Sequence, residues 1–217
     1  MSDIKFGRDL IFALKATAGM SVHELVIPVG SPPIAFLRPV ATKKELIKAE
    51  DVYVLTNWRN QFVQAFLTEF LATESRTIRW LEEIVGPNEE KILFMVDDLN
   101  GRTFGYMGLD YINWSQSYAE ADAVVRGGEA SPGTMKRALK TLLSWAQGQL
   151  GLCQLWVRVR SDNTALEFYN KVGYREVHRV PLRKIEEPEM IRWVEDESVK
   201  NASIHLVYMI YEVANKS

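Results

Sequence analysis

The sequence predicts an α+β fold: a mixed, mostly antiparallel central sheet with one parallel strand pair, a crossover helix and helices on both faces. The first observation is a run of three strand-like segments, at residues 91–98, 102–112 and 119–127. Asn100-Gly101 between the first two favours a tight hairpin. The second observation is a strongly periodic helix after the third segment, which leads to strand 152–159. A crossover of this kind joins parallel strands, so the sheet is mixed.

The first third of the chain predicts both helices and strands. Residues 8–19 indicate a short helix, and residues 22–29 and 34–40 indicate strands across the turn-forming cluster GSPP. Residues 42–62 indicate a helix with Thr42 as its N-cap. A further helical stretch, 61–86, is expected to break near ATESRT, residues 72–77, and to end at the stop signal Gly86-Pro87. We therefore expect residues 1–33 to form an N-terminal extension and residues 34–217 to form the main domain.

The last third alternates strand and helix. Helix 134–149 carries apolar residues at spacings of three and four, which is typical of a helix packed on a core. Alternation along 152–159 places Cys153 on the inward face. Helix 163–172 and strand 174–180 follow, with a last strand at 203–213. The charged segment 183–200 is an insertion in which we expect a short helix.

Composition excludes several classes of protein. The 217 residues are 47% hydrophobic and carry a formal charge of −2, which argues against a general nucleic-acid binder. No segment has the roughly 18 apolar residues that span a bilayer, so no membrane partner is expected. The single cysteine, Cys153, fits a reducing, cytoplasmic location. His23, His178 and His205 lack metal-ligand spacing, so no metal is expected.

The segment SDNTALEFYNKVGY, residues 161–174, carries the most specific motif in the chain. It resembles a segment of the GCN5-related N-acetyltransferase (GNAT) superfamily, with Asn163, Leu166 near the family's alanine position, Tyr169 and Gly173-Tyr174 in matching order. The words LRPV, WRN and WL, earlier in the chain, resemble the branch that holds ribosomal-protein and amino-sugar acetyltransferases. The likeness spans about residues 36 to 180.

The resemblance implies an acetyl-CoA-dependent N-acetyltransferase. Acetyl-CoA is the co-substrate, and a primary amine attacks it directly without a covalent acyl-enzyme. A nucleotide-linked amino sugar is the first acceptor to consider, so the expected partner is a small-molecule amine. Alternatives are a protein N-terminal or ribosomal-protein acetyltransferase, which would bind a peptide N-terminus, and a non-catalytic CoA-binding module. The N-terminal 30 residues are a candidate dimerisation element, so a homodimer is also considered.

The resemblance also implies a phosphate-binding loop before helix 134–149. Ser131 is expected to cap this helix, with Pro132 at its first position. The N–H groups at the helix start would then face the pyrophosphate, which the helix dipole favours. Glu129 departs from the family pattern, since its charge repels phosphate. The expected cofactor-binding residues are Val124, Val125, Arg126, Gly127, Gly128, Ser131, Gly133, Thr134, Met135, Asn163 and Phe168.

Three residues are candidates for the chemistry. Phe168 and Tyr169 point about 100° apart on a helix, so we expect Phe168 to pack and Tyr169 to present its hydroxyl to the departing thiolate. Alternation puts Glu120 and Asp122 on one face of their strand, where Glu120 is the first and Asp122 the second choice of general base. A merely solvated acidic face is the competing interpretation.

The acceptor side is the least defined part of the sequence. Trp58, Arg59 and Asn60 are expected at a helix end, where Arg59 would hold a phosphate or carboxylate of the acceptor. The competing interpretation is the polar end of an amphipathic helix. Trp193, inside the insertion, either walls the acceptor site or anchors the insertion.

Overall fold

The computed structural model describes residues 4–20 and 24–211, which belong to two compact units. Unit 1 is Met1–Thr56 with Thr73–Leu155, and unit 2 is Asn57–Ala72 with Trp156–Ser217. In unit 1, β1 (Ile27–Val29) pairs antiparallel with β2 (Ala35–Pro39), so the strand of the expected N-terminal extension joins the sheet of the main domain.

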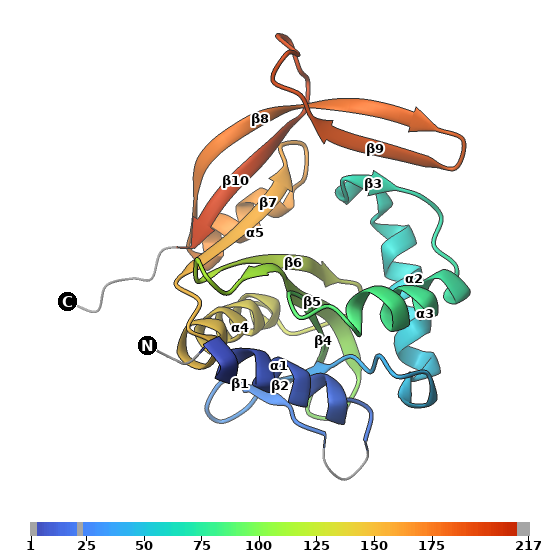
Figure 1. Cartoon of the computed structure of the whole chain (residues 1–217), viewed down its shortest axis with the longest axis vertical. Helices are drawn as coiled ribbons and strands as arrows, with labels where there is room; N and C mark the ends of the chain where they lie inside the picture. Colours follow the sequence, from blue (N-terminus) through green and yellow to red (C-terminus); the bar gives the residue numbers. More distant parts are fainter. Residues whose placement is uncertain (1–3, 21–23, 212–217) are drawn as a thin grey trace, which may run out of the picture. The chain divides into compact units, whose positions relative to one another are not determined.

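Unit 1 is built on a run of antiparallel strands in the order β1-β2-β4-β5-β6 (Figure 1). The later strands are β4 (Ile92–Asp97), β5 (Thr103–Asn113) and β6 (Tyr118–Arg126). This meander agrees with the expected segments, and Gly101 takes the positive φ of its turn. The helical elements are α1 (Ile4–Thr17), η1 (Lys44–Leu46), α3 (Glu74–Trp80), the π-helical η3 (Leu81–Val85) and α4 (Thr134–Leu150).

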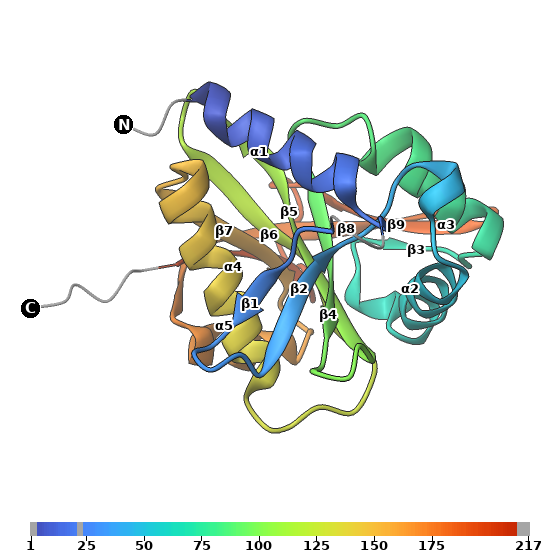
Figure 2. The same ribbon diagram turned by 90° about the horizontal axis from the view of Figure 1, so that it is seen from below.

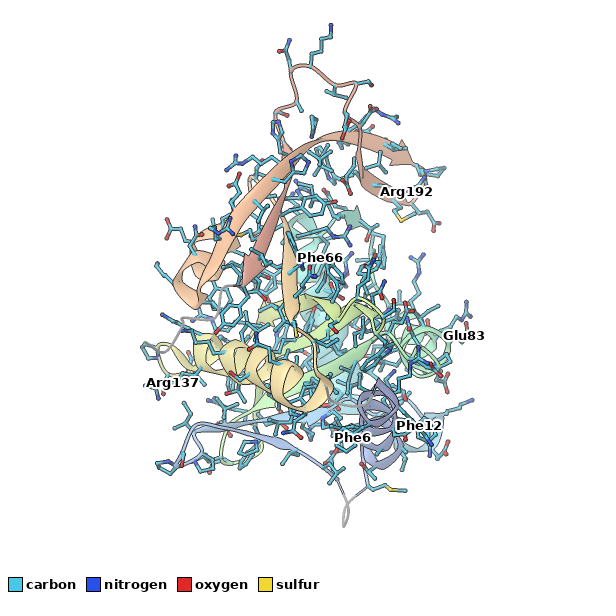
Figure 3. All side chains as sticks on the ribbon, turned by 60° about the vertical axis from the view of Figure 1, so that its left-hand side comes forward. Phe6, Phe12, Phe66, Glu83, Arg137 and Arg192 are labelled. Atoms are coloured by element: carbon cyan, nitrogen blue, oxygen red, sulfur yellow. The ribbon has the colours of Figure 1, made fainter. Side chains whose placement is uncertain are left out.

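Helix α4 is the main cover of this sheet. Its apolar residues are buried, as the three-and-four spacing predicts, and it packs across β1, β2 and β5. Helix α1 packs in turn against α4 (Figure 2). Its inward face carries Ile11 and Leu14, which are buried, whereas Phe6 and Phe12 project from the outer side of the helix (Figure 3).

The helices between β2 and β4 differ from the sequence expectation. Helix α2 (Ala49–Gln61) begins several residues after Thr42, which is buried and caps no helix. The first part of the helical stretch expected at 61–86 is instead η2 (Val63–Ala65) and the short strand β3 (Thr68–Glu69), and α3 follows the break expected near residues 72–77. Thr73 caps α3 by accepting a hydrogen bond from the N–H of Arg76. The break therefore falls where this cap starts a new helix.

Unit 2 contains strands in the order β7-β10-β8-β9-β3, again with antiparallel neighbours. These are β7 (Gln154–Arg160), whose first two residues belong to unit 1, β8 (Tyr174–Glu187), β9 (Met190–Glu195) and β10 (His205–Tyr211). Helix α5 (Ala165–Val172) packs on β8. The expected last strand reaches to 213, of which residues 212 and 213 lie outside the described range.

Two expectations for this part of the chain are wrong. Residues 183–200 hold no helix: β8 continues to Glu187 and pairs with β9 as a hairpin arm (Figure 1). Cross-strand pairing of Ile185 with Arg192 and of Lys184 with Trp193 stabilises strands where charge alone suggested a helix. Cys153 is exposed, because it precedes β7 and its N–H turns back to the carbonyl of Ser117.

Candidate active site

Strand β6 is bulged in its second half. Tyr106 of β5 pairs with Val125, but Gly108 pairs with Asp122, so two residues of β6 oppose Met107 alone. Ala123, one of these two, has φ 52°, a left-handed conformation that a non-glycine residue adopts only at a cost. Bulges of this kind re-aim side chains and backbone groups beside active sites. The simple alternation expected along this strand therefore ends at Asp122.

The two carboxylates of β6, Glu120 and Asp122, differ in their surroundings. Glu120 is buried, at 8% exposure, and accepts a hydrogen bond from the hydroxyl of Tyr118. The solvated acidic face that competed with the catalytic interpretation is therefore wrong for Glu120. Asp122 is half-exposed and accepts a hydrogen bond of 3.0 Å from the ammonium of Lys91. Lys91 therefore shares its positive charge with Asp122, whereas the hydrogen bond to Glu120 comes from the neutral hydroxyl of Tyr118.

Lys91 is a buried cation between two acids. Its Nζ donates to Asp110 as well as to Asp122. Burial lowers the pKa of the Lys91 ammonium, but Asp122 and Asp110 outweigh it and hold that pKa above its ordinary value.

Lys15 shows the opposite balance, since burial and the charge of Lys91 lower its pKa to about 8. Its Nζ donates to the backbone carbonyls of Val85 and Asn88, at 2.7 and 2.6 Å.

The loop before α4 departs from the expected geometry. The N-cap is Gly133, with φ 82°, and not Ser131. The carbonyl of Ser131 accepts from both the N–H and the hydroxyl of Thr134, so the helix begins two residues after Pro132. Among the described residues, no backbone partner faces the N–H groups of Gly133 and Met135. This helix start therefore offers free N–H donors of the kind that bind phosphate.

The glycines at the end of β6 have a structural role. The N–H groups of Gly127 and Gly128 both donate to the carbonyl of Phe104, at 3.2 and 2.9 Å. A Cβ on Gly128 would lie 3.0 Å from the Cα of Phe104, so glycine permits this close approach. These two N–H groups are consequently engaged within the fold, and the cofactor-binding role of the two glycines stays a prediction.

Helix α5 and the residues before it carry the other motif residues, all within unit 2. The side-chain oxygen of Asn163 accepts from the N–H of Ala165, which opens the helix. Tyr169 is the buried member of the aromatic pair and Phe168 is only half-buried, so the expected packing is reversed. The ring of Tyr169 meets the edges of Phe168 and Tyr174. A buried ring with one polar atom is well positioned, which suits a catalytic hydroxyl.

The expected acceptor residues at the end of α2 bind their own segment. Arg59 donates to the carbonyl of Thr68, and its guanidinium lies 3.9 and 4.6 Å from the ring centroids of Phe66 and Phe70. Asn60 forms two hydrogen bonds with the backbone of Ala72, at 3.0 and 2.8 Å. Both side chains thus fold residues 62–72 back on α2, which corrects the substrate-binding role expected for them.

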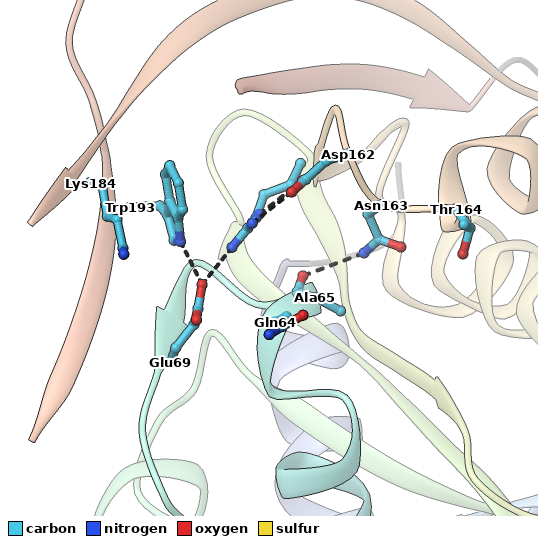
Figure 4. A pocket seen from close by; sticks show the side chains of 9 residues that line it. Gln64, Ala65, Glu69, Asp162, Asn163, Thr164, Lys184 and Trp193 are labelled. Carbon is cyan, nitrogen blue, oxygen red and sulfur yellow. Dashed lines mark hydrogen bonds and ion pairs between the residues drawn. The ribbon is translucent and has the colours of Figure 1, made fainter. Parts of the chain in front are cut away.

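A charged cluster in unit 2 surrounds Arg160, which is only 5% exposed. Its guanidinium forms two hydrogen bonds with Asp162, at 3.0 and 2.7 Å, and one of 2.8 Å with Oε1 of Glu69. It also lies 4.4 Å from the ring centroid of Trp193, whose indole nitrogen donates to the same Glu69 oxygen (Figure 4). The cluster borders a pocket of about 380 Å³ that Gln64, Asn163, Thr164 and Lys184 also line.

Sequence reasoning missed Arg160, Glu69 and the pocket. Arg160 lies at the end of a strand, and Glu69 lies in a segment expected to be helical, so neither had a local signal. Trp193 is expected either to wall the acceptor site or to anchor the insertion. It lines the pocket, and its backbone N–H donates to the carbonyl of Leu67.

Within residues 4–20 and 24–211, no three or more His, Cys, Asp or Glu side chains come together in a group that could hold a metal ion. Within the same residues, no helix combines the length and apolar character needed to cross a membrane. His178 contacts the ring of Tyr208, and His23 lies outside the described residues.

Together, the bulged strand, the open helix start and the α5 motif are typical of an acyltransferase that uses a CoA thioester. The acetyltransferase (GNAT) domain family matches residues 36–175, which is more than half of the chain, and the protein belongs to this family. No curated protein matches the sequence significantly.

Several solved structures have a similar fold. A probable GNAT-family acetyltransferase from Chromobacterium violaceum has a TM-score of 0.63 at 14% identity, with 89% of each chain covered. Spermidine N-acetyltransferase from Vibrio cholerae, solved with CoA and spermine, has a TM-score of 0.60 at 16% identity, covering 81% of this chain and 95% of that one. A GCN5-related N-acetyltransferase from Brucella melitensis has a TM-score of 0.61 at 14% identity, covering 87% and 78%.

The comparisons confirm the main expectations from the sequence. The α+β fold with a mixed, mostly antiparallel sheet, a parallel strand pair with a crossover helix and helices on both faces is confirmed. The protein is an N-acetyltransferase that uses acetyl-CoA. The branch of the family and the acceptor amine are matters for proposal.

Proposed function

We propose that the protein transfers the acetyl group of acetyl-CoA to the primary amine of a small polar acceptor by direct attack. The observation that carries this proposal is the family match over residues 36–175, because all of the candidate catalytic and cofactor-binding residues lie inside this span. The N–H groups at the start of α4 would hold the pyrophosphate. Arg126 is exposed at the end of β6 and would add positive charge.

Each step of the reaction has a candidate residue. Glu120 takes a proton from the ammonium, since an alkyl amine with a pKa near 10 is mostly protonated at neutral pH. The amine nitrogen then attacks the thioester carbon, and a backbone N–H of the Asp122–Val125 bulge stabilises the oxyanion. The C–S bond breaks as the amide forms, and the hydroxyl of Tyr169 protonates the thiolate. The nitrogen loses its second proton to solvent, and solvent returns a proton to Tyr169. Asp122 remains the second choice of base.

For the acceptor, a nucleotide-linked amino sugar remains the first candidate and a protein N-terminus the second. The structures from Vibrio cholerae bear the name of spermidine N-acetyltransferase, which makes a polyamine the third. The test is to mix acetyl-CoA with UDP-linked and free amino sugars, N-terminal peptides and spermidine, and to follow free thiol. Transfer to an amino sugar supports the first choice. Thiol release with none of these amines would contradict the proposal.

A non-catalytic CoA-binding module is the second candidate. It is favoured by the loop before α4, where Phe104 occupies the N–H groups of Gly127 and Gly128, and Glu129 adds a negative charge. Calorimetric titration with CoA separates the two functions. CoA binding with no acetyl transfer to any amine would identify the module, whereas turnover identifies the enzyme.

A further inference from the structure

The pocket of unit 2 presents one carboxylate oxygen with no partner. Oε1 of Glu69 accepts hydrogen bonds from both Arg160 and Trp193, whereas Oε2 accepts none among the described residues. Burial raises the pKa of Glu69, but the bonds from Trp193 and Arg160 outweigh it and lower that pKa. The carboxylate is therefore ionised at neutral pH, and it has an unused oxygen beside the pocket (Figure 4). Such an oxygen suits an ammonium ligand and does not suit a general base.

The remaining charges of the pocket are already paired. Both oxygens of Asp162 are engaged by Arg160. The ammonium of Lys184 lies 2.6 Å from a carboxylate oxygen of Glu186, outside the pocket lining. Because Lys184 is paired with Glu186, the two carboxylates Glu69 and Asp162 face only one cation, Arg160, and the net charge of −1 leaves room for one ligand cation. A polyamine, with several ammonium groups, would meet Arg160 and Lys184 with no further carboxylate to bind.

The uncharged lining suits hydroxyl groups. The amide of Gln64 makes no hydrogen bond within the described residues, and it can both donate and accept. The exposed hydroxyl of Thr164 has the same capacity. Trp193 contributes a flat indole whose polar edge is already bound to Glu69. About 380 Å³ lies at the small end of the usual range of ligand pockets, roughly 300–1,000 Å³.

We propose that this pocket is the acceptor site and that it selects a monoamine rich in hydroxyl groups, such as an amino sugar, over a polyamine. The inference rests on the proposed function. The ammonium of the acceptor first binds Oε2 of Glu69, and Gln64 and Thr164 bind its hydroxyls; once Glu120 has taken its proton, the neutral amine is no longer held by this ion pair. Arg160 is a positioning residue, because it holds Glu69 in place and does not contact the acceptor through a free N–H.

The test uses the full chain, with D-glucosamine and spermidine as probes, in calorimetric titrations and thiol-release assays. Glu69→Gln keeps the shape of the side chain and removes its charge. We expect this variant to bind D-glucosamine at least tenfold more weakly, and to raise KM for it by a similar factor with little change in kcat. Glu187→Gln is the matched control, because Glu187 lies on the β8–β9 arm of the same unit, pairs with Arg192 and does not line the pocket. Its affinity should equal that of the wild type.

A second variant covers the case in which Glu69→Gln loosens the arm. Gln64 is exposed and makes no hydrogen bond to a residue that the structure describes, so Gln64→Ala should leave the melting temperature unchanged and weaken D-glucosamine binding several-fold. Unchanged affinity in both variants would overturn the proposal, as would tighter binding of spermidine than of D-glucosamine. If thiol is released with an amine but neither variant alters KM, the proposed function stands and this pocket is not the acceptor site.

Discussion

Trp193 of β9 and Glu69 of β3 are joined by a hydrogen bond of 2.6 Å, although the two residues are 124 positions apart in the chain. The donor is an indole N–H and the acceptor is a carboxylate, a pairing about twice as strong as one between neutral groups. Arg160 binds the same oxygen and packs on the same indole. The β8–β9 arm is therefore held to residues 66–69 within unit 2.

Replacing Trp193 by Phe should weaken this attachment. The variant keeps an aromatic ring but removes the N–H that Glu69 accepts, so we expect unit 2 to lose about 2 kcal/mol of unfolding free energy. Urea unfolding monitored by circular dichroism measures the change. Trp145→Phe is a suitable control, because Trp145 meets Phe94 edge-on and has no hydrogen bond to a described residue. An equal loss in both variants would show that packing, and not the hydrogen bond, matters.

Replacing Tyr169 by Phe tests the proposed acid. The ring contacts with Phe168 and Tyr174 remain, so acetyl-CoA affinity should change little. Turnover should fall by about 100-fold or more, in both kcat and kcat/KM, because the hydroxyl acts mainly in the transition state. Rapid-quench measurement of acetyl transfer gives the rate of the chemical step. Unchanged chemistry would make Tyr169 a packing residue only.

Tyr174→Phe is the matched control for that experiment. The hydroxyl of Tyr174 is buried without a hydrogen-bond partner among residues 4–20 and 24–211, and burial raises its pKa well above the ordinary value. Removing a buried, unsatisfied hydroxyl should stabilise the fold, by about 1 kcal/mol or more. Thermal unfolding should show a higher Tm with turnover unchanged. A lower Tm would indicate that the hydroxyl has a stabilising partner, such as a bound water.

Glu120→Gln and Asp122→Asn distinguish the two candidate bases. We expect Glu120→Gln to lower kcat/KM by about 100-fold or more, because the amine loses the group that deprotonates it. Asp122→Asn should have a smaller effect on kcat/KM, since Lys91 already neutralises Asp122. Steady-state assays at saturating acetyl-CoA, with folding checked by circular dichroism, compare them. The reverse order of effects would assign the base to Asp122.

Lys15 should make the stability of the protein depend on pH. Its pKa is about 8 in the folded protein and about 10.5 when unfolded. Between these values the unfolded chain binds more protons, so stability rises with pH. Relative to Lys15→Met, the wild type should gain about 2 kcal/mol between pH 7 and 9.5. Urea unfolding of both proteins at each pH measures the difference, and a constant difference would contradict the lowered pKa.

The elements with strong local patterns were predictable from the sequence. The apolar spacing of α4, the Asn-Gly hairpin between β4 and β5, and the aromatic motif of α5 are properties of short segments. The fold class of the protein followed from the order of these elements, and its resemblance to the family followed from one motif. Such patterns are predictive because local conformation depends on neighbours three or four residues away, or two in a strand.

The partners of polar side chains were decided by the tertiary structure. Arg59 and Asn60 have the composition of a ligand site, yet they bind residues 66–72 because the chain folds back there. Similarly, Oε1 of Glu69 has its two hydrogen bonds only because Arg160 and Trp193, both distant in the sequence, converge on it. The sequence by itself determined the elements with strong local patterns, the family and the cofactor of this protein. Tertiary folding alone decided which charges are neutralised and which oxygen is left for a ligand, because electrostatic interactions act across space and not along the chain.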